Sequence, residues 1–180
     1  MPNWCTNTIS MKGIASLPLY TVKDGVKHLD FEKITPMPET IRNTESGTRT
    51  SLAMTAWDTK KLTTNLANHS SHLIKWLSEM PADELDKYFH EGKKYYDNIE
   101  KYGAPTWYEW ACLNWGTKWN ACDTEILSPN KVRIETAWCP PHQYLLTLSC
   151  RYPDKQITCR WHEEGGTSGS FKLKNGARLD

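Results

Sequence analysis

Two pairs of reactive side chains repeat one spacing in the C-terminal part of the chain. Cys139 and His142 stand three residues apart, and Cys159 and His162 repeat that interval. Two cysteines with two histidines form a common zinc ligand set. The second pair falls on an expected strand, where an offset of three sends side chains to opposite faces, and two prolines place the first pair at a helix entry. We therefore expect no metal and no cofactor at these residues.

A second cluster of ionisable residues precedes a loop of small residues. His162, Glu163 and Glu164 come directly before "GGTSGS", and such groups can exchange protons with a substrate. No nucleophile or oxyanion-binding motif accompanies them, and the loop lacks the Gly-Lys-Ser/Thr ending of a phosphate-binding loop. We expect a protein that is not an enzyme. A metal-dependent hydrolase that uses His142 or His162 is an alternative.

Tryptophan is the most informative residue type in this sequence. There are nine, and four of them lie in "WYEWACLNWGTKWNAC", residues 107–122. Tryptophan has an apolar body and a polar edge, so it suits half-buried surfaces that meet a ligand. Trp119 and Trp138 are expected to be neighbours on adjoining strands. The predicted binding residues are Asn114, Trp115, Lys118, Trp119, Trp138, Arg160, Trp161 and His162.

This set of residues predicts a cleft for a planar anionic ligand such as a nucleotide. The rings would stack on the ligand, and Lys118 and Arg160 would supply positive charge. The alternative is structural, because the same tryptophans can pack between helices and sheet.

Composition excludes several other classes of function. The chain has 180 residues with a formal charge of +1, which argues against sequence-independent binding to duplex DNA. No apolar run reaches the roughly 20 residues that span a bilayer. The N-terminus lacks the basic start and apolar segment of a secretory signal. We expect a cytoplasmic protein, with no membrane partner and with six reduced cysteines that are mostly buried.

The order of the expected elements predicts the fold. Period-two alternation marks a first strand at residues 3–13, and a helix is expected at 104–116. Further elements follow: a strand at 117–126, a strand at 131–138, a helix from 140 to before Pro153, a strand at 156–165, and a last strand at 171–180 with an Asn-Gly turn. This order is the split β-α-β pattern of the ferredoxin-like fold. We therefore expect an α+β protein with an antiparallel sheet and helices on one face.

The middle of the chain differs from the two ends. Apolar residues such as Leu62, Leu66, Leu73 and Leu77 recur near helical spacing, and Pro81 precedes a further helical pattern. This predicts an insertion of two or three helices. The expected domains are a ferredoxin-like core of residues 1–40 and 104–180, and a helical insertion of residues 41–103.

Five separated motifs resemble one family. "MPNWCTN", "LDFEKITPMP", "NWGTKWNA", "TAWCPP" and "WHEEGGTSGSF" are similar to motifs of the YubB-type ferredoxin-like domain family of bacteriophage and plasmid proteins. That family usually has Ser at the position of Cys139, which implies that no thiol chemistry is needed there. The resemblance implies an accessory protein of a phage or mobile element. Such a protein would inhibit a host defence by binding a host protein or a small nucleotide-like ligand.

Single-stranded nucleic-acid binding is a further hypothesis. Ferredoxin-like sheets with exposed aromatic residues stack bases in RNA-recognition domains. No Lys/Arg-Gly-aromatic motif precedes the tryptophans in this chain, so the hypothesis depends on what the sheet exposes.

Overall fold

The protein consists of two compact units. The structure, a computed structural model, describes residues 3–61 and 69–179. One unit combines Met1–Met37 with Ala111–Asp180, and the other is Pro38–Trp110. We call them the ferredoxin-like unit and the helical unit, and each is described by itself.

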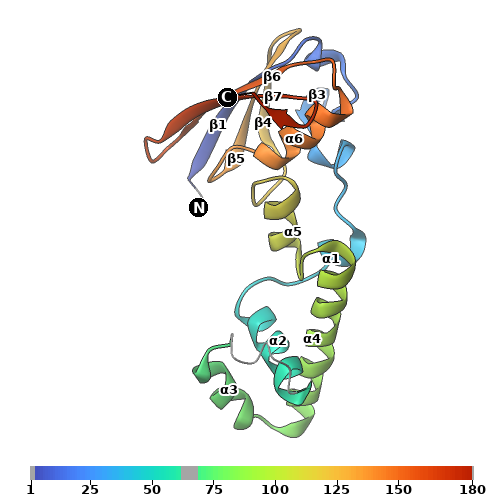
Figure 1. Cartoon of the computed structure of the whole chain (residues 1–180), viewed down its shortest axis with the longest axis vertical. Helices are drawn as coiled ribbons and strands as arrows, with labels where there is room; N and C mark the ends of the chain where they lie inside the picture. Colours follow the sequence, from blue (N-terminus) through green and yellow to red (C-terminus); the bar gives the residue numbers. More distant parts are fainter. Residues whose placement is uncertain (1–2, 62–68, 180) are drawn as a thin grey trace. The chain divides into compact units, whose positions relative to one another are not determined.

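The ferredoxin-like unit is built on a six-stranded antiparallel sheet (Figure 1). Its strand order is β4-β5-β1-β6-β7-β8, so the first strand of the chain lies between β5 and β6. This is the predicted α+β, ferredoxin-like arrangement, extended by β7 and β8. The elements are β1 (Trp4–Ser10), β4 (Cys122–Ser128), β5 (Lys131–Ala137), α6 (His142–Arg151), β6 (Ile157–Glu163), β7 (Ser168–Lys174) and β8 (Ala177–Arg178).

The two faces of this sheet differ in burial. Along β1, Cys5, Asn7 and Ile9 are fully buried, whereas the residues between them are half-buried. Helix α6 packs on the buried face, where the ring of His142 lies 4.9 Å from that of Phe171. Helix packing on one face leaves the other face of β1, β5, β6 and β7 for polar side chains.

A hairpin that the sequence analysis missed follows β1. It consists of β2 (Tyr20–Lys23) and β3 (Val26–Leu29), after the short helix η1 (Ile14–Ser16) and before η2 (Phe31–Lys33). Asp24 and Gly25 both have positive φ, 50° and 78°, as a two-residue hairpin turn requires. The Asp-Gly pair was the available signal. The predicted Asn-Gly turn near the end of the chain, at Asn175–Gly176, is confirmed.

Other boundaries also differ from the prediction. The strand expected at 117–126 begins only at Cys122, and β7 begins at Ser168, inside the segment expected to be a loop. The expectation that most cysteines are buried is wrong, because the structure buries only Cys5 and Cys159. Cys122 is half-buried, and three others are exposed: Cys112, Cys139 and Cys150.

The helical unit contains α1 (Glu39–Arg42), α2 (Thr48–Lys61), α3 (Ser71–Ser78) and α4 (Ala82–Tyr102), and α5 (Trp107–Asn114) begins within it. Helices α2 and α4 cross closely at Gly92, where a Cβ atom would lie 2.0 Å from the carbonyl oxygen of Ala53. Leu52, Ala56 and Leu77 form a small apolar core. The predicted pattern included Leu62 and Leu66, which lie outside the described residues. No helix among the described residues has the length and hydropathy needed to cross a membrane.

Candidate functional site

Three of the predicted residues meet at one end of the ferredoxin-like sheet. Lys118 and Trp119 lie in the loop before β4, not in a strand as expected. The Lys118 Nζ atom lies 4.5 Å from the ring centre of Trp119 and 5.0 Å from that of Trp138. One ammonium group therefore contacts two indole rings, an arrangement that is electrostatically favourable.

Trp138 is held in a strained turn. It was expected on the same face of a strand as Val132, but β5 ends at Ala137. Trp138 has a φ of 69°, and the amide of Cys139 donates to the carbonyl of Ala137 at 2.9 Å, which closes a γ-turn of the rare positive-φ type. A bulky residue in this region is an outlier, and such strain concentrates at ligand sites. The turn leaves 43% of Trp138 exposed.

A third aromatic residue joins this group from β1. The ring of Trp4 lies 6.3 Å from that of Trp119 at an interplanar angle of 45°. Ala137, directly opposite Trp4, is fully buried, and its carbonyl accepts a hydrogen bond from Thr117 at 2.8 Å. The loop before β4 therefore lies against the end of β5. We call Trp4, Lys118, Trp119 and Trp138 the tryptophan cluster.

Buried hydrogen bonds fix the turn that carries Trp138. The Thr136 hydroxyl donates to the carbonyl of Cys139 at 2.7 Å, and it accepts from Asn7 Nδ2 at 2.8 Å. Asn7 and Thr136 are both fully buried. Because buried polar groups are costly to leave unpaired, this chain of bonds ties the turn to the centre of the sheet.

The other tryptophans of the predicted cleft lie elsewhere. Trp115 is only 4% exposed, and its Nε1–H donates to the carbonyl of Thr35, so it belongs to the core and not to a cleft wall. Trp161 lies on the helix-covered face of β6 and covers Gly169 on β7, where a Cβ would meet the indole at 3.0 Å. Asn114 is the last residue of α5 and is half-buried.

Arg160 and His162 lie on the face of the sheet opposite Trp161. We call the face that carries Arg160 and His162 the outward face. The strand register places twelve outward side chains in three rows of four across β5, β1, β6 and β7. The rows are Lys131–Ser10–Thr158–Lys172, Arg133–Thr8–Arg160–Ser170, and Glu135–Thr6–His162–Ser168. The next outward position along β1 after Thr6 is Trp4, so the tryptophan cluster lies beside the third row.

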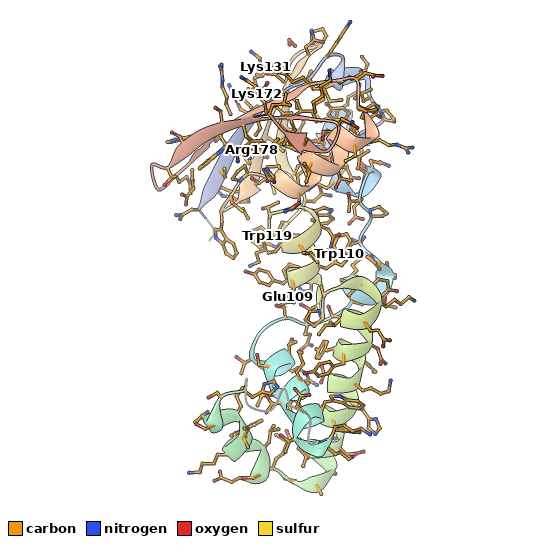
Figure 2. All side chains as sticks on the ribbon, in the orientation of Figure 1. Glu109, Trp110, Trp119, Lys131, Lys172 and Arg178 are labelled. Atoms are coloured by element: carbon orange, nitrogen blue, oxygen red, sulfur yellow. The ribbon has the colours of Figure 1, made fainter. Side chains whose placement is uncertain are left out.

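The rows place positive charge around small hydroxyl groups. Arg133 and Arg160 flank Thr8, and Lys131 lies beside Ser10. Figure 2 shows Lys131 and Lys172 at one end of the sheet, away from Trp119. Arg133 pairs with Glu125 at 2.8 Å. Within residues 3–61 and 69–179, the side chains of Lys131, Arg160 and His162 make no hydrogen bond or ion pair, so they are available to an anion.

The structure separates the four residues that suggested zinc. Cys159 is buried on the helix-covered face, where burial raises the pKa of its thiol to about 12, whereas His162 is exposed on the outward face. Cys139 donates to the carbonyl of Gly116. In the described part of the chain, no three His, Cys, Asp or Glu side chains are grouped to hold a metal ion.

The local sequence pattern did not indicate that the site includes Trp4, Lys131, Lys172 and the β1 hydroxyl groups. Strand alternation indicates which residues of one strand share a face, and it did place Arg133 away from Val132. It does not give the register between strands that are more than 100 residues apart, so the rows were not visible in the sequence.

A match to a family model supports the ferredoxin-like fold of the C-terminal part of the chain. The family model described as the ferredoxin-like domain in Api92-like protein matches residues 114–180. This finding overturns the resemblance to the YubB-type family, and it shows no link to bacteriophages. The crystal structure of Api92 from Yersinia pseudotuberculosis aligns with a TM-score of 0.42 and 10% sequence identity, covering 100% of this chain and 97% of that chain. A search of curated proteins found no match.

Proposed function

We propose that the ferredoxin-like unit binds single-stranded nucleic acid on its outward face. The observation that carries this proposal is the alignment of four cationic side chains in two neighbouring rows: Lys131, Lys172, Arg133 and Arg160. Single-strand binding combines a basic track for the backbone with aromatic rings for the bases. The outward face supplies the track, and the tryptophan cluster supplies the rings.

The shape of the face favours a single strand. The central strand contributes Thr8, whose short hydroxyl side chain leaves room for a phosphate between Arg133 and Arg160. Ser10 adds a second short hydroxyl group beside Lys131. Hydroxyl groups and Lys or Arg side chains make most phosphate contacts in nucleic-acid complexes. Arg133 and Arg160 are two strand spacings apart, about 10 Å, so a phosphate above Thr8 would lie between two guanidinium groups.

The net charge of the ferredoxin-like unit also supports binding of an anionic strand by this unit. The ferredoxin-like unit has 13 Lys and Arg against 10 Asp and Glu, so it is positive although the whole chain is near neutral. Local positive charge attracts a short anionic strand without the many phosphate contacts that tight duplex binding needs.

A mononucleotide is the second candidate ligand. Lys118 lies over two indole rings, so a phosphate held by its ammonium group would place a base near Trp138 or Trp119. Competition in the binding experiment described next separates the two candidates. A mononucleotide would displace the strand only from the tryptophan cluster. The host-protein partner and the inhibition of a host defence stay predictions.

Fluorescence anisotropy with a labelled 12-nucleotide single strand tests the proposal. We expect binding that weakens with salt, with a slope of log K against log salt of about −3 for four neutralised phosphates. Arg160→Ala should weaken binding and reduce the slope by about 0.7. Arg151→Ala is the matched control, because it removes an equal charge from the exposed end of α6. Equal effects of both variants, or binding without salt dependence, would contradict the proposal.

A further inference from the structure

The third outward row contains an acid, a hydroxyl and an imidazole side by side. Glu135 on β5 is directly opposite Thr6 on β1, and Thr6 is directly opposite His162 on β6. The Thr6 hydroxyl donates to Glu135 Oε1 at 2.8 Å, which fixes the orientation of the carboxylate. His162 is exposed, and no side chain within residues 3–61 and 69–179 holds its ring.

The spacing of this row suits a phosphodiester. Glu135 and His162 are two strand spacings apart, which places their Cα atoms about 10 Å from each other on one face. Only the short side chain of Thr6 lies between them, so a phosphate above Thr6 would have a carboxylate on one side and an imidazole on the other. An acid and a base that flank one reacting group are the requirement for concerted proton transfer.

From this geometry we infer that the outward face cleaves a bound strand when that strand is RNA. Glu135 accepts the proton of a ribose 2′-hydroxyl, and the 2′-oxygen attacks the adjacent phosphorus. The bond from phosphorus to the 5′-oxygen of the next nucleotide breaks, and the imidazolium of His162 gives its proton to that oxygen. The products are a 2′,3′-cyclic phosphate and a 5′-hydroxyl. No water, metal ion or other reactant enters the step.

The neighbouring row supplies the remaining group that the reaction needs. Arg133 and Arg160 lie on either side of Thr8, one outward position along the strands from Glu135 and His162. Negative charge grows on the non-bridging oxygens as the fifth bond to phosphorus forms, and fixed cations stabilise it. Arg160 has no ion-pair partner in the described part of the chain, so its guanidinium can serve this role.

This inference rests on the proposed binding function, and the test separates the two. A labelled 12-nucleotide RNA is incubated with the protein in EDTA, beside DNA of the same sequence and RNA that is 2′-O-methylated throughout. We expect cleavage of the unmodified RNA alone, with cyclic phosphate termini identified by mass spectrometry. Anisotropy with the methylated RNA measures binding without cleavage.

Two variants and two controls complete the experiment. His162→Ala and Glu135→Gln should each lower the cleavage rate at least 100-fold, while the Kd for methylated RNA changes less than threefold. His72→Ala and Glu100→Gln change exposed residues of the helical unit and should leave the rate unchanged. A contaminating nuclease would cleave equally in every preparation, including His162→Ala and Glu135→Gln.

Each outcome either supports or overturns the inference that the outward face cleaves RNA. Binding of methylated RNA without cleavage of unmodified RNA overturns the inference and leaves the proposed function in place. Cleavage of DNA, or equal cleavage by His162→Ala, also overturns it. Absence of any binding removes the inference and the proposed function together.

Discussion

The backbone amide of Cys139 donates a hydrogen bond to the carbonyl of Ala137, two residues earlier in the chain. The 2.9 Å hydrogen bond between them encloses Trp138 in a turn with a φ of 69°. Nothing in the identity of these two neighbours requires such a turn, and a tryptophan is among the least favourable residues to occupy it. The strained residue is also an exposed member of the tryptophan cluster, so it is a candidate contact for the proposed ligand.

Substitutions of Trp138 separate strain from binding. Trp138→Gly and Trp138→Ala both remove the indole, so both should weaken single-strand binding by about 1–3 kcal/mol. Only glycine adopts the positive φ without a steric penalty. We expect Trp138→Gly to be more stable to urea than Trp138→Ala by about 1 kcal/mol. A more stable alanine variant would show that the turn is not strained.

Asn7 should be needed for stability although it lies far from the surface. Asn7→Ala removes the amide that donates to the Thr136 hydroxyl and to the carbonyl of Cys5, and each lost hydrogen bond costs about 0.5–1.5 kcal/mol. The matched control is Thr8→Ala on the outward face of the same strand, which should change the free energy of unfolding by less than about 0.5 kcal/mol. Urea unfolding measures both, and equal effects would contradict the role of the buried network.

Gly92→Ala should destabilise the helical unit, although alanine usually stabilises a helix relative to glycine. Alanine favours a helix over glycine by about 1 kcal/mol, but its Cβ would lie 2.0 Å from the Ala53 carbonyl oxygen on α2. Separating the helices to admit this atom costs about 1–3 kcal/mol. Thermal unfolding followed by circular dichroism at 222 nm measures the change. Lys94→Ala, an exposed substitution on the same helix, is the control, and a Gly92→Ala variant as stable as wild type would exclude the close crossing.

Low pH should lower the folding stability of the ferredoxin-like unit, because Asp30 becomes protonated. Burial alone would raise the pKa of this carboxyl, but hydrogen bonds from Thr21, Asn120 and the amide of Glu32 lower it below its ordinary value. A lowered folded pKa gives stability that is complete above the unfolded pKa of about 3.9 and is lost as pH falls through the folded pKa.

Asp30→Asn tests this pH dependence. The variant should have a lower free energy of unfolding at pH 7, and this difference from wild type should shrink as pH falls below about 4. Asp154→Asn, an exposed substitution, should follow the wild-type curve. A difference that is constant with pH would exclude Asp30 as the source.

The sequence predicted those parts of the structure that depend on local pattern. Alternation of Cys5, Asn7 and Ile9 with polar residues identified β1 and its buried face, and the Asn-Gly pair identified the last turn. The prediction failed where the position of a side chain depends on the path of a loop. Trp115 and Trp119 are only four residues apart, yet one is in the core and the other is in the tryptophan cluster, because the loop after α5 turns along the end of β5.

The candidate site was predicted only in part for a related reason. Trp119, Trp138 and Lys118 do lie together, as expected, but through a loop and a γ-turn and not across paired strands. The outward rows bring together residues from four strands, and β1 is separated from β5 by more than 100 residues. Pairing over such distances is a property of the whole fold, so no local pattern reports it.

The position of the helical unit in the chain has a consequence for folding kinetics. Pairing of Ser10 with Lys131 closes a loop of about 120 residues, of which Pro38–Trp110 contributes about 73. Lengthening the loop from about 48 to about 120 residues adds only about 0.8 kcal/mol of closure entropy, so the insertion costs little stability. Such distant pairing nevertheless slows folding, because entropy is lost before the contacts form. We expect the local helices to form in an early phase and the central strand of the sheet to be added last.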